Sequence, residues 1–286
     1  MANRRVLVKR RKAARNIRKI TRTMQLIATA RFQAAYKRAT AGKPYTEKLT
    51  QLMQNLARAA GGLEHPLMAH NPEAGRGALI VLTSDRGMCG GYNTHVLRAT
   101  NEFLAAADDP VDVSMVGKKG VAFFRFLGNE MAEAITDFGD APRFDQVEPL
   151  ANRLMQRFAA GELATVDVAY TQFLSSARQR AVIERILPLS AETGIEEEAA
   201  GLEYEFSPQP QELLDELLPA SVRVRIYQCF TDAVVSEQIA RMVAMKAATD
   251  AAEDMIKRLT MQYNRARQTQ ITMELLDIVG GANALE

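Results

Sequence analysis

The 286-residue chain has no tryptophan, and aromatic residues make up only 6% of it. A sequence poor in aromatics and rich in Ala and Met favours packed helices over a β-sandwich. It has only two cysteines, Cys89 and Cys229, and they lack the CxxC spacing of zinc and redox motifs. We therefore expect reduced thiols in an intracellular protein, not a disulfide framework.

Long uncharged apolar runs are also missing. A membrane-spanning helix needs about 18 or more such residues, so we expect no span. The opening segment, Met1–Lys12, is rich in Arg and has no acidic residue, as in transit peptides. The same basic pattern continues beyond any cleavage point, so we assign it to the mature chain.

Acidic residues are absent before Glu47, whereas this stretch holds fourteen Lys and Arg. The reverse holds for residues 191–220, with nine Asp and Glu and no basic residue. A basic stretch raises the alternative of nucleic-acid binding. Its aromatics (Phe32, Tyr36, Tyr45) are not interleaved as stacking platforms, and the net charge is only +2. We therefore expect no nucleic-acid partner.

Two stretches at opposite ends of the chain have strong helical character, Asn16–Ala60 and Pro219–Leu285. At 1.5 Å per residue they would be about 65 Å and about 100 Å long. A compact domain of this size has no interior for such helices. They are therefore expected to project from it and to cover one another.

The apolar spacing in both stretches predicts a coiled-coil seam with alternating steps of three and four. In the first stretch the predicted seam is Ile17, Ile20, Met24, Ile27 and Ala34. In the second it is Ile226, Phe230, Ala233, Ala240, Ala244, Ala247, Ala251, Met255 and Leu259. Because the stretches lie at opposite ends of the sequence, an antiparallel pair is the simplest arrangement. The last segment, 274–285, is apolar and would then be an exposed interaction patch or a frayed terminus.

The middle of the chain alternates short apolar runs with helical patterns. Strands are expected at 78–82, 111–116 and 165–170, an antiparallel edge strand at 181–188, and helices at 94–107, 118–127 and 145–160. This alternation predicts an α/β domain with a largely parallel sheet. The predicted fold is therefore a central Rossmann-like α/β domain plus a long antiparallel coiled coil, divided as 1–60 (first helix), 61–76 (linker), 77–207 (α/β domain) and 208–286 (last helix).

Few residues suggest chemistry. The segment Thr83–Asn93 is a Gly-rich turn between a strand and a helix, but it matches neither GxGxxG nor GxxxxGK[ST]. It is either a tight turn stabilised by Asp85 or a ligand loop. The histidines His65, His70 and His95 have no metal-site spacing. We expect no cofactor, metal site or catalytic residue, and keep a nucleotide-binding enzyme and an interaction scaffold as alternatives.

Four blocks of sequence carry a specific signal, and the last of them begins with the pattern YNRARQ. The blocks are Asn16–Met24, Thr83–Asn93, Ala240–Asp250 and Tyr263–Gly281. Together they resemble one known family, the gamma subunit of F-type ATP synthase, and they occur in the family's order over nearly the whole chain.

The resemblance implies a central rotor shaft without bond chemistry. The coiled coil would turn inside a hexamer of three alpha and three beta subunits, and the α/β domain would lie beside the epsilon subunit and the ring of c subunits. Contacts with the beta subunits would involve Met24, Arg241, Gln268, Thr272 and Glu274, and contacts with the c-ring would involve Tyr204 and Glu205. The implied location is the cytoplasmic face of a bacterial inner membrane, or less favourably the mitochondrial matrix side.

This chain has none of the inserted cysteines that make some plant relatives redox-sensitive, so thiol regulation is not expected. Met88 stands where the family often has Leu, a near-isosteric change.

Overall fold

A computed structural model describes residues 4–59, 65–69, 71–189 and 210–283. The chain divides into two compact units. One contains residues 30–240, and the other contains residues 1–29 together with 241–286. Tyr204 and Glu205 lie outside the described residues.

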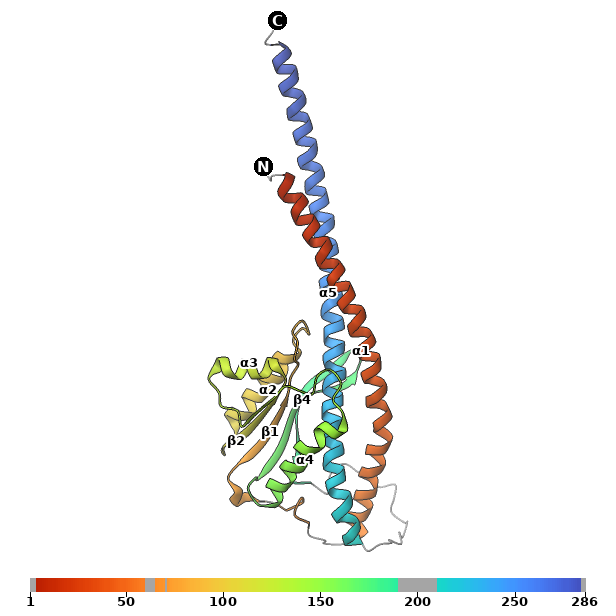
Figure 1. Ribbon diagram of the computed structural model, residues 1–286, viewed down its shortest axis with the longest axis vertical. Helices are drawn as coiled ribbons and strands as arrows, with labels where there is room; N and C mark the ends of the chain where they lie inside the picture. The colour runs from red at the N-terminus through yellow and green to blue at the C-terminus, as the bar shows by residue number, and fades with distance from the viewer. Residues whose placement is uncertain (1–3, 60–64, 70, 190–209, 284–286) are drawn as a thin grey trace. The chain divides into compact units, whose positions relative to one another are not determined.

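Two long helices are the first and last elements of the chain, α1 (Arg4–Ala59) and α5 (Pro210–Asn283) (Figure 1). Both begin earlier than the sequence pattern predicts. The predicted start at Pro219 is wrong, because Pro219 lies inside α5. The preceding segment is helical because Leu214 and Leu218, one turn apart, are both buried in the core.

The unit of residues 30–240 is built on one five-stranded sheet with the order β3-β2-β1-β4-β5. The strands are β1 (Gly77–Leu82), β2 (Val111–Val116), β3 (Glu133–Ile135), β4 (Thr165–Ser175) and β5 (Arg178–Leu187). The first four are parallel, whereas β5 pairs with β4 in the antiparallel sense, as predicted. β3 is not predicted from the sequence, because three residues carry too little periodicity to indicate a strand.

Helices cover both faces of this sheet. The crossover helices are α2 (Tyr92–Ala106), α3 (Lys118–Leu127) and α4 (Phe144–Ala159). Successive side chains of β1 alternate between two cores. Leu79 and Val81 pack with α2 and α3, whereas Ile80 and Leu82 join a larger cluster with α4 and α5. A short 3-10 turn, Pro72–Ala74, precedes β1.

Part of α5 forms the centre of the larger core. Ile226, Phe230 and Ala233 are buried, as the sequence pattern predicts, but the core cluster that contains them is formed with the sheet and α4 and is not a seam between two long helices. In the same unit α1 contributes Ala35 and Ala39 to a cluster with Val235 of α5.

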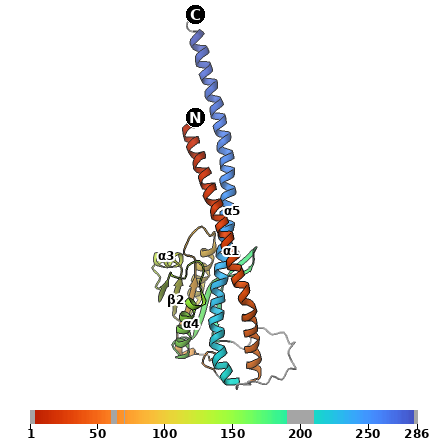
Figure 2. The ribbon, with the colours of Figure 1, turned by 45° about the vertical axis from the view of Figure 1, so that its right-hand side comes forward.

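In the second unit, α1 and α5 form an antiparallel pair that both ribbon views show side by side (Figure 2). The buried positions of α1 are Leu7, Ala14, Thr21 and Ala28, spaced seven residues apart. A strict seven-residue repeat is the signature of a coiled-coil seam.

The predicted α1 seam is therefore wrong in its residues. Ile17, Ile20 and Ile27 are 51%, 60% and 49% exposed, Met24 is half-buried and Ala34 is exposed. The seam uses small residues because they let two helix axes approach closely. Apolarity alone selected the larger isoleucines, which face away from α5.

The predicted α5 seam is displaced by about one residue. The buried positions are Arg241, Met245, Thr249, Ala252 and Leu259. Of the predicted positions in this unit Leu259 is correct, Ala244 is half-buried, and Ala247, Ala251 and Met255 are exposed. Ala240, the last residue of the other unit, is half-buried.

Candidate functional site

The end of α5 is an apolar surface that no described residue covers. Tyr263 and Ala266 still pack around Leu7 near the beginning of α1. From Arg267 to Gly280, however, every side chain is exposed. The large apolar side chains of this segment are 45–69% exposed, and we call them the apolar end: Ile271, Met273, Leu275, Leu276, Ile278 and Val279.

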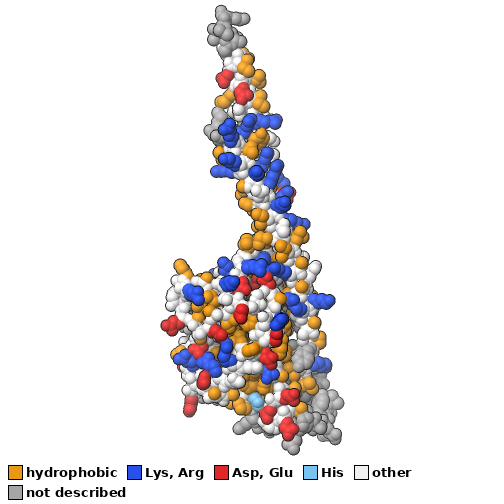
Figure 3. Space-filling view, viewed as in Figure 1, with side chains coloured by type: hydrophobic (Ala, Val, Ile, Leu, Met, Phe, Trp, Pro, Cys, Tyr) orange, Lys and Arg blue, Asp and Glu red, His pale blue; other side chains and the backbone are white. Residues whose placement is uncertain are grey.

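Basic side chains cover much of the paired helices below the apolar end (Figure 3). On α1 most of the Lys and Arg between residues 4 and 22 are exposed. The Arg11 guanidinium lies 4.9 Å from the centroid of the Tyr263 ring, a cation–π contact that joins the two helices. This unit therefore presents positive charge next to an uncovered apolar surface.

Five of the residues assigned by resemblance lie in this unit. Gln268, Thr272 and Glu274 are exposed on α5 beyond its covered part. The Thr272 hydroxyl donates to the backbone carbonyl of Gln268 at 3.0 Å, and Glu274 accepts from Gln270 at 2.8 Å, so both of these bonds lie within α5. Arg241 differs from them, because it is only 7% exposed.

The Gly-rich turn between β1 and α2 is held by its own polar groups. Ser84 N donates to Asn93 Oδ1 at 2.9 Å, which ties the start of the turn to the first turn of α2. Asp85 connects this turn to the start of α3. Its carboxylate accepts from Lys118 N at 3.0 Å and so caps α3. Met88 adopts a left-handed conformation with φ of 64°, which is uncommon for a residue other than glycine.

In α/β sheets of this kind, ligands bind outside the carboxyl ends of the parallel strands. Outside the ends of β1 and β2 little space is left. Phe230, Ala233, Val234 and Glu237 of α5 line a pocket of only about 30 Å³ with the ends of β1 and β2. Nucleotide-sized ligands need pockets of about 300 Å³ or more.

The backbone near this pocket is packed too closely for a phosphate cradle. The Thr83 hydroxyl donates to the Val116 carbonyl at 2.7 Å and accepts from Gly120 N at 2.9 Å. A wider groove of about 520 Å³ lies between α2 and α3, but side chains such as Arg98, Lys119 and Phe123 line it, and no glycine does. The geometry does not favour the nucleotide-binding alternative. Among the described residues, moreover, no acidic, His or Cys cluster suits a metal ion.

Asp140 joins α1 to the turn. Its carboxylate pairs with Arg31 of α1 and, at 3.1 Å, with Arg86 of the turn. Two guanidinium groups thus share one carboxylate that is 22% exposed. Such a shared, partly screened pair fixes geometry more than it adds stability.

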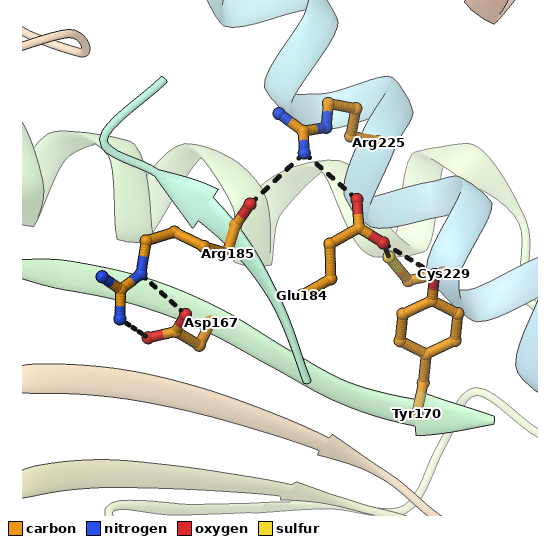
Figure 4. A network of polar contacts seen from close by, with 6 residues as sticks. All are labelled: Asp167, Tyr170, Glu184, Arg185, Arg225 and Cys229. Atoms are coloured by element: carbon orange, nitrogen blue, oxygen red, sulfur yellow. Dashed lines mark hydrogen bonds and ion pairs between the residues drawn. The ribbon is translucent and has the colours of Figure 1, made fainter. Parts of the chain in front are cut away.

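A second polar network joins α5 to the sheet and centres on Glu184 of β5 (Figure 4). Its carboxylate accepts from Tyr170 Oη at 2.7 Å and from Arg225 at 3.1 Å, and Cys229 Sγ lies 4.0 Å away. Burial raises the pKa of both Tyr170 and Cys229, and the charge on Glu184 adds to the shift in both cases. Both groups therefore stay protonated.

No described helix combines the length and apolarity needed to cross a bilayer. The family described as ATP synthase matches residues 3–285 of the chain. The "ATP synthase gamma chain" of Rhodopirellula baltica (strain DSM 10527) is 45% identical over 296 residues and covers all of both chains. That of Dehalococcoides mccartyi (strain CBDB1) is 41% identical over 288 residues, again covering all of both.

Solved structures show the same fold at low sequence identity. A chain of the Euglena gracilis mitochondrial ATP synthase, determined as OSCP/F1/c-ring in rotational state 3, has a TM-score of 0.69 and 19% identity, covering 99% of this chain and 94% of that one. A chain of the Tetrahymena thermophila mitochondrial ATP synthase central stalk and c-ring has a TM-score of 0.59 and 18% identity, covering 80% and 99%. With full-length relatives above 40% identity, the chain belongs to the ATP synthase gamma chain family.

Proposed function

We propose that this chain is the central rotor shaft of an F-type ATP synthase and carries no catalytic site of its own. Its rotation would couple proton flow through a c-ring to conformational change in catalytic beta subunits, and would run in reverse during ATP hydrolysis. Family membership supports this function. The closely packed ends of β1 and β2 support a role without bound nucleotide.

The uncovered apolar end of α5 is the observation that carries the proposal. A monomeric protein rarely exposes a contiguous apolar surface of this kind, and such surfaces mark interaction sites. A sleeve formed by three alpha and three beta subunits would cover it. Few fixed hydrogen bonds would then resist rotation, because apolar contacts have no preferred direction.

A rotor drives its partners only through contact free energies that differ between their conformational states. The apolar end provides few contacts of that kind. We assign the distinguishing contacts to Met24, Arg241, Gln268, Thr272 and Glu274. The exposed Lys and Arg of α1 would meet acidic surface on the beta subunits, which steers the approach without locking it.

The remaining partners would contact the unit of residues 30–240. The epsilon subunit and the c-ring would contact the α/β domain and the segment that contains Tyr204 and Glu205. We retain the division into 1–60, 61–76, 77–207 and 208–286. Peripheral attachment to the cytoplasmic face of a bacterial inner membrane follows from these partners.

Single-molecule rotation tests the function directly. The chain is assembled with alpha and beta subunits on a surface, and a marker on its α/β domain is followed during ATP hydrolysis. We expect stepwise rotation in one direction. ATP hydrolysis at normal rates with a stationary marker, or with no chain bound, would refute the proposal.

Substitutions on α5 test the assigned contacts. Gln268, Thr272 and Glu274 are exposed, so replacing them with Ala should leave the isolated chain's stability within about 0.5 kcal/mol of the parent's. In the complex we expect a loss of coupled ATP synthesis. Gln262→Ala, on an exposed position of the covered part of α5, is the matched control. Equal coupling in the triple variant and the control would remove these residues from the site.

A further inference from the structure

α5 packs against the α/β core with a largely apolar face. Val222, Ile226, Cys229 and Phe230 are all buried in the core cluster formed with α4 and the sheet. Apolar burial stabilises this packing in proportion to area and has no preferred direction. Polar contacts beside this face are directional and add to the packing in setting the rotation of the helix about its axis.

Two arginines on α5 make directional contacts beside this apolar face. Arg223 Nε donates to Asn152 Oδ1 of α4 at 2.8 Å and lies 3.9 Å from Glu148, one turn earlier on α4. Arg225 donates to Glu184 Oε1 of β5 at 3.1 Å and to the Arg185 carbonyl at 3.3 Å. We call Arg223 and Arg225 the arginine pair.

The arginine pair contacts two different elements on opposite sides of the helix. Two positions along an α-helix correspond to a rotation of about 200°. The two side chains therefore leave α5 in nearly opposite directions, one toward α4 and the other toward β5. Turning α5 either way moves one guanidinium away from its partners. Charge-assisted hydrogen bonds are the strongest of the polar contacts and depend on geometry.

The acceptor on the β5 side is itself held in place (Figure 4). Tyr170 of β4 donates to Glu184 at 2.7 Å, which leaves the other carboxylate oxygen for Arg225. Next to it, Arg185 makes two bonds to Asp167 of β4, at 3.0 and 3.3 Å. These bonds join β5 to β4, so a force on Arg225 is resisted by two strands.

We propose that the arginine pair sets the rotational position of α5 on the α/β core and transmits torque between them. The inference rests on the proposed rotor function, because only a rotating subunit experiences torque. α5 continues as one helix to Asn283. A twist applied to the α/β core would therefore enter the helix through these contacts and the apolar cluster together.

The first test uses the isolated full chain and does not depend on the rotor function. Spin labels are placed at Glu216 of α5 and Ala134 of β3, which are both exposed, while the native cysteines are buried. Arg223 and Arg225 are both replaced by Met, which keeps the aliphatic stem. We expect the distribution of distances between the labels to broaden, because the directional contacts are lost.

A matched control removes the same charge elsewhere. Arg143→Met with Arg153→Met breaks ion pairs within the start of α4 (Arg143 with Asp145, 2.6 Å) and between α4 and β3 (Arg153 with Glu133, 2.5 Å). Neither pair involves α5, so the distance distribution of the control should be as narrow as that of the parent chain. The inference is overturned if the distance distribution broadens equally in the control and in the arginine variant. It is also overturned if both variants keep the width of the parent.

The second test measures torque transmission in the assembled complex. The marker on the α/β core fluctuates in angle during pauses between steps, and a softer connection gives wider fluctuations. Charge-assisted bonds are about twice as strong as neutral ones, so removing both should raise the mean-square angle above that of the parent and of the Arg143→Met, Arg153→Met control. If the double variant does not fold, Glu184→Gln keeps the shape of the acceptor and should give a smaller increase.

The two proposals fail differently. If the parent chain never rotates, the rotor function is wrong whatever the labels show. If the parent rotates and the arginine variant fluctuates no more than the control, the torque role of the arginine pair is wrong.

Discussion

The hydroxyl oxygens of Thr21 and Thr249 lie 2.8 Å apart, although 228 positions separate the two residues in the sequence. Both side chains are buried, at 9% and 8% exposure, in the seam between α1 and α5. Each also lies near a carbonyl of its own helix, Arg18 O at 3.2 Å and Met245 O at 2.7 Å. A buried polar pair in a seam of small residues specifies the register of a coiled coil.

This contact predicts a selective disulfide. Thr21→Cys with Thr249→Cys should form a bond on mild oxidation, because the two side chains already meet and a disulfide needs Cβ atoms about 3.5–4.5 Å apart. The shift of the oxidised chain on a non-reducing gel measures it. Ile20→Cys with Thr249→Cys is the control and should stay reduced, since Ile20 is 60% exposed. Bonding in the control pair alone would mean a different register.

The sequence predicts some features of the fold well, for identifiable reasons. The α/β alternation and the antiparallel edge strand follow from local periodicity, and β2 and α3 have the predicted bounds. Periodicity in α1 is ambiguous, because one helix face meets α5 and another carries exposed Ile17 and Ile20. Apolarity marks both faces without saying which one faces the other helix. The seven-residue spacing of Leu7, Ala14, Thr21 and Ala28 is the signal that distinguishes them.

The partner-contact residues are indicated by the family resemblance and not by their local chemistry. Gln268 and Thr272, for example, are exposed polar residues on a helix, and no sequence pattern distinguishes them from other surface residues. The network around Glu184 was not predicted, because it depends on the pairing of β4 with β5 and on the position of α5. Contacts of this range appear only when the fold is known.

Close packing at Gly120 predicts a destabilising substitution. A Cβ there would lie 2.6 Å from Thr83 Oγ1 and still closer to Met115 Sδ. Gly120→Ala should lower the free energy of unfolding by about 1–3 kcal/mol through overpacking. Chemical denaturation measures the loss.

Gly128→Ala separates crowding from backbone strain. Gly128 has φ of +73°, and a Cβ added there would meet no other group within 4 Å. Only the left-handed conformation is penalised, at about 1–2 kcal/mol. Asn tolerates the left-handed conformation better than Ala, so Gly128→Asn should recover part of the loss and Gly120→Asn should not. Recovery at Gly120 alone would contradict this explanation.

Asp112 should make stability depend on pH in the acid range. Burial raises its pKa, but hydrogen bonds from Arg157 (2.8 Å) and Arg76 (2.7 Å) outweigh this, so the pKa in the folded chain lies below the usual 3.8. A lowered pKa stabilises the fold above the unfolded value, and this contribution is lost as pH falls through the folded value. Asp112→Asn should therefore cost about 1 kcal/mol at pH 7, after allowance for solvent screening.

Denaturation of the parent and the Asp112→Asn variant across pH 2–7 tests this. The difference between them should shrink as the parent's carboxyl becomes protonated. Asp109→Asn, at an exposed position beside the same strand, is the control and should show no such trend. A constant difference down to the lowest pH would show that the ion pairs are not its cause.

The two thiols should be unreactive in the folded chain. Cys89 and Cys229 are both free and only 2% exposed. Burial, with the charge of Glu184, also raises the pKa of the Cys229 thiol, and the thiolate is the reactive form. A coloured thiol reagent should label both cysteines quickly in denaturant and slowly without it. Fast labelling of the folded chain, or a change in ATPase rate on mild oxidation that Cys89→Ser and Cys229→Ser abolish, would contradict this.

The two apolar faces of α1 predict opposite effects in the free and assembled chain. Ala28 is 1% exposed in the seam, so Ala28→Leu should overpack it and cost about 1–3 kcal/mol in the isolated chain. Ile20→Ala should change the stability of the isolated chain by less than about 0.5 kcal/mol, because Ile20 is largely exposed. In the assembled complex we expect the opposite ranking for affinity. Ile20→Ala should weaken binding to the other subunits more than Ala28→Leu does, since Ile20 faces away from α5 and is available to those subunits. Unfolding of the free chain and its affinity for an alpha–beta hexamer give both quantities. A large loss of stability in free Ile20→Ala would mean that the isoleucine face, and not the seven-residue alanine and threonine seam, holds the two helices together.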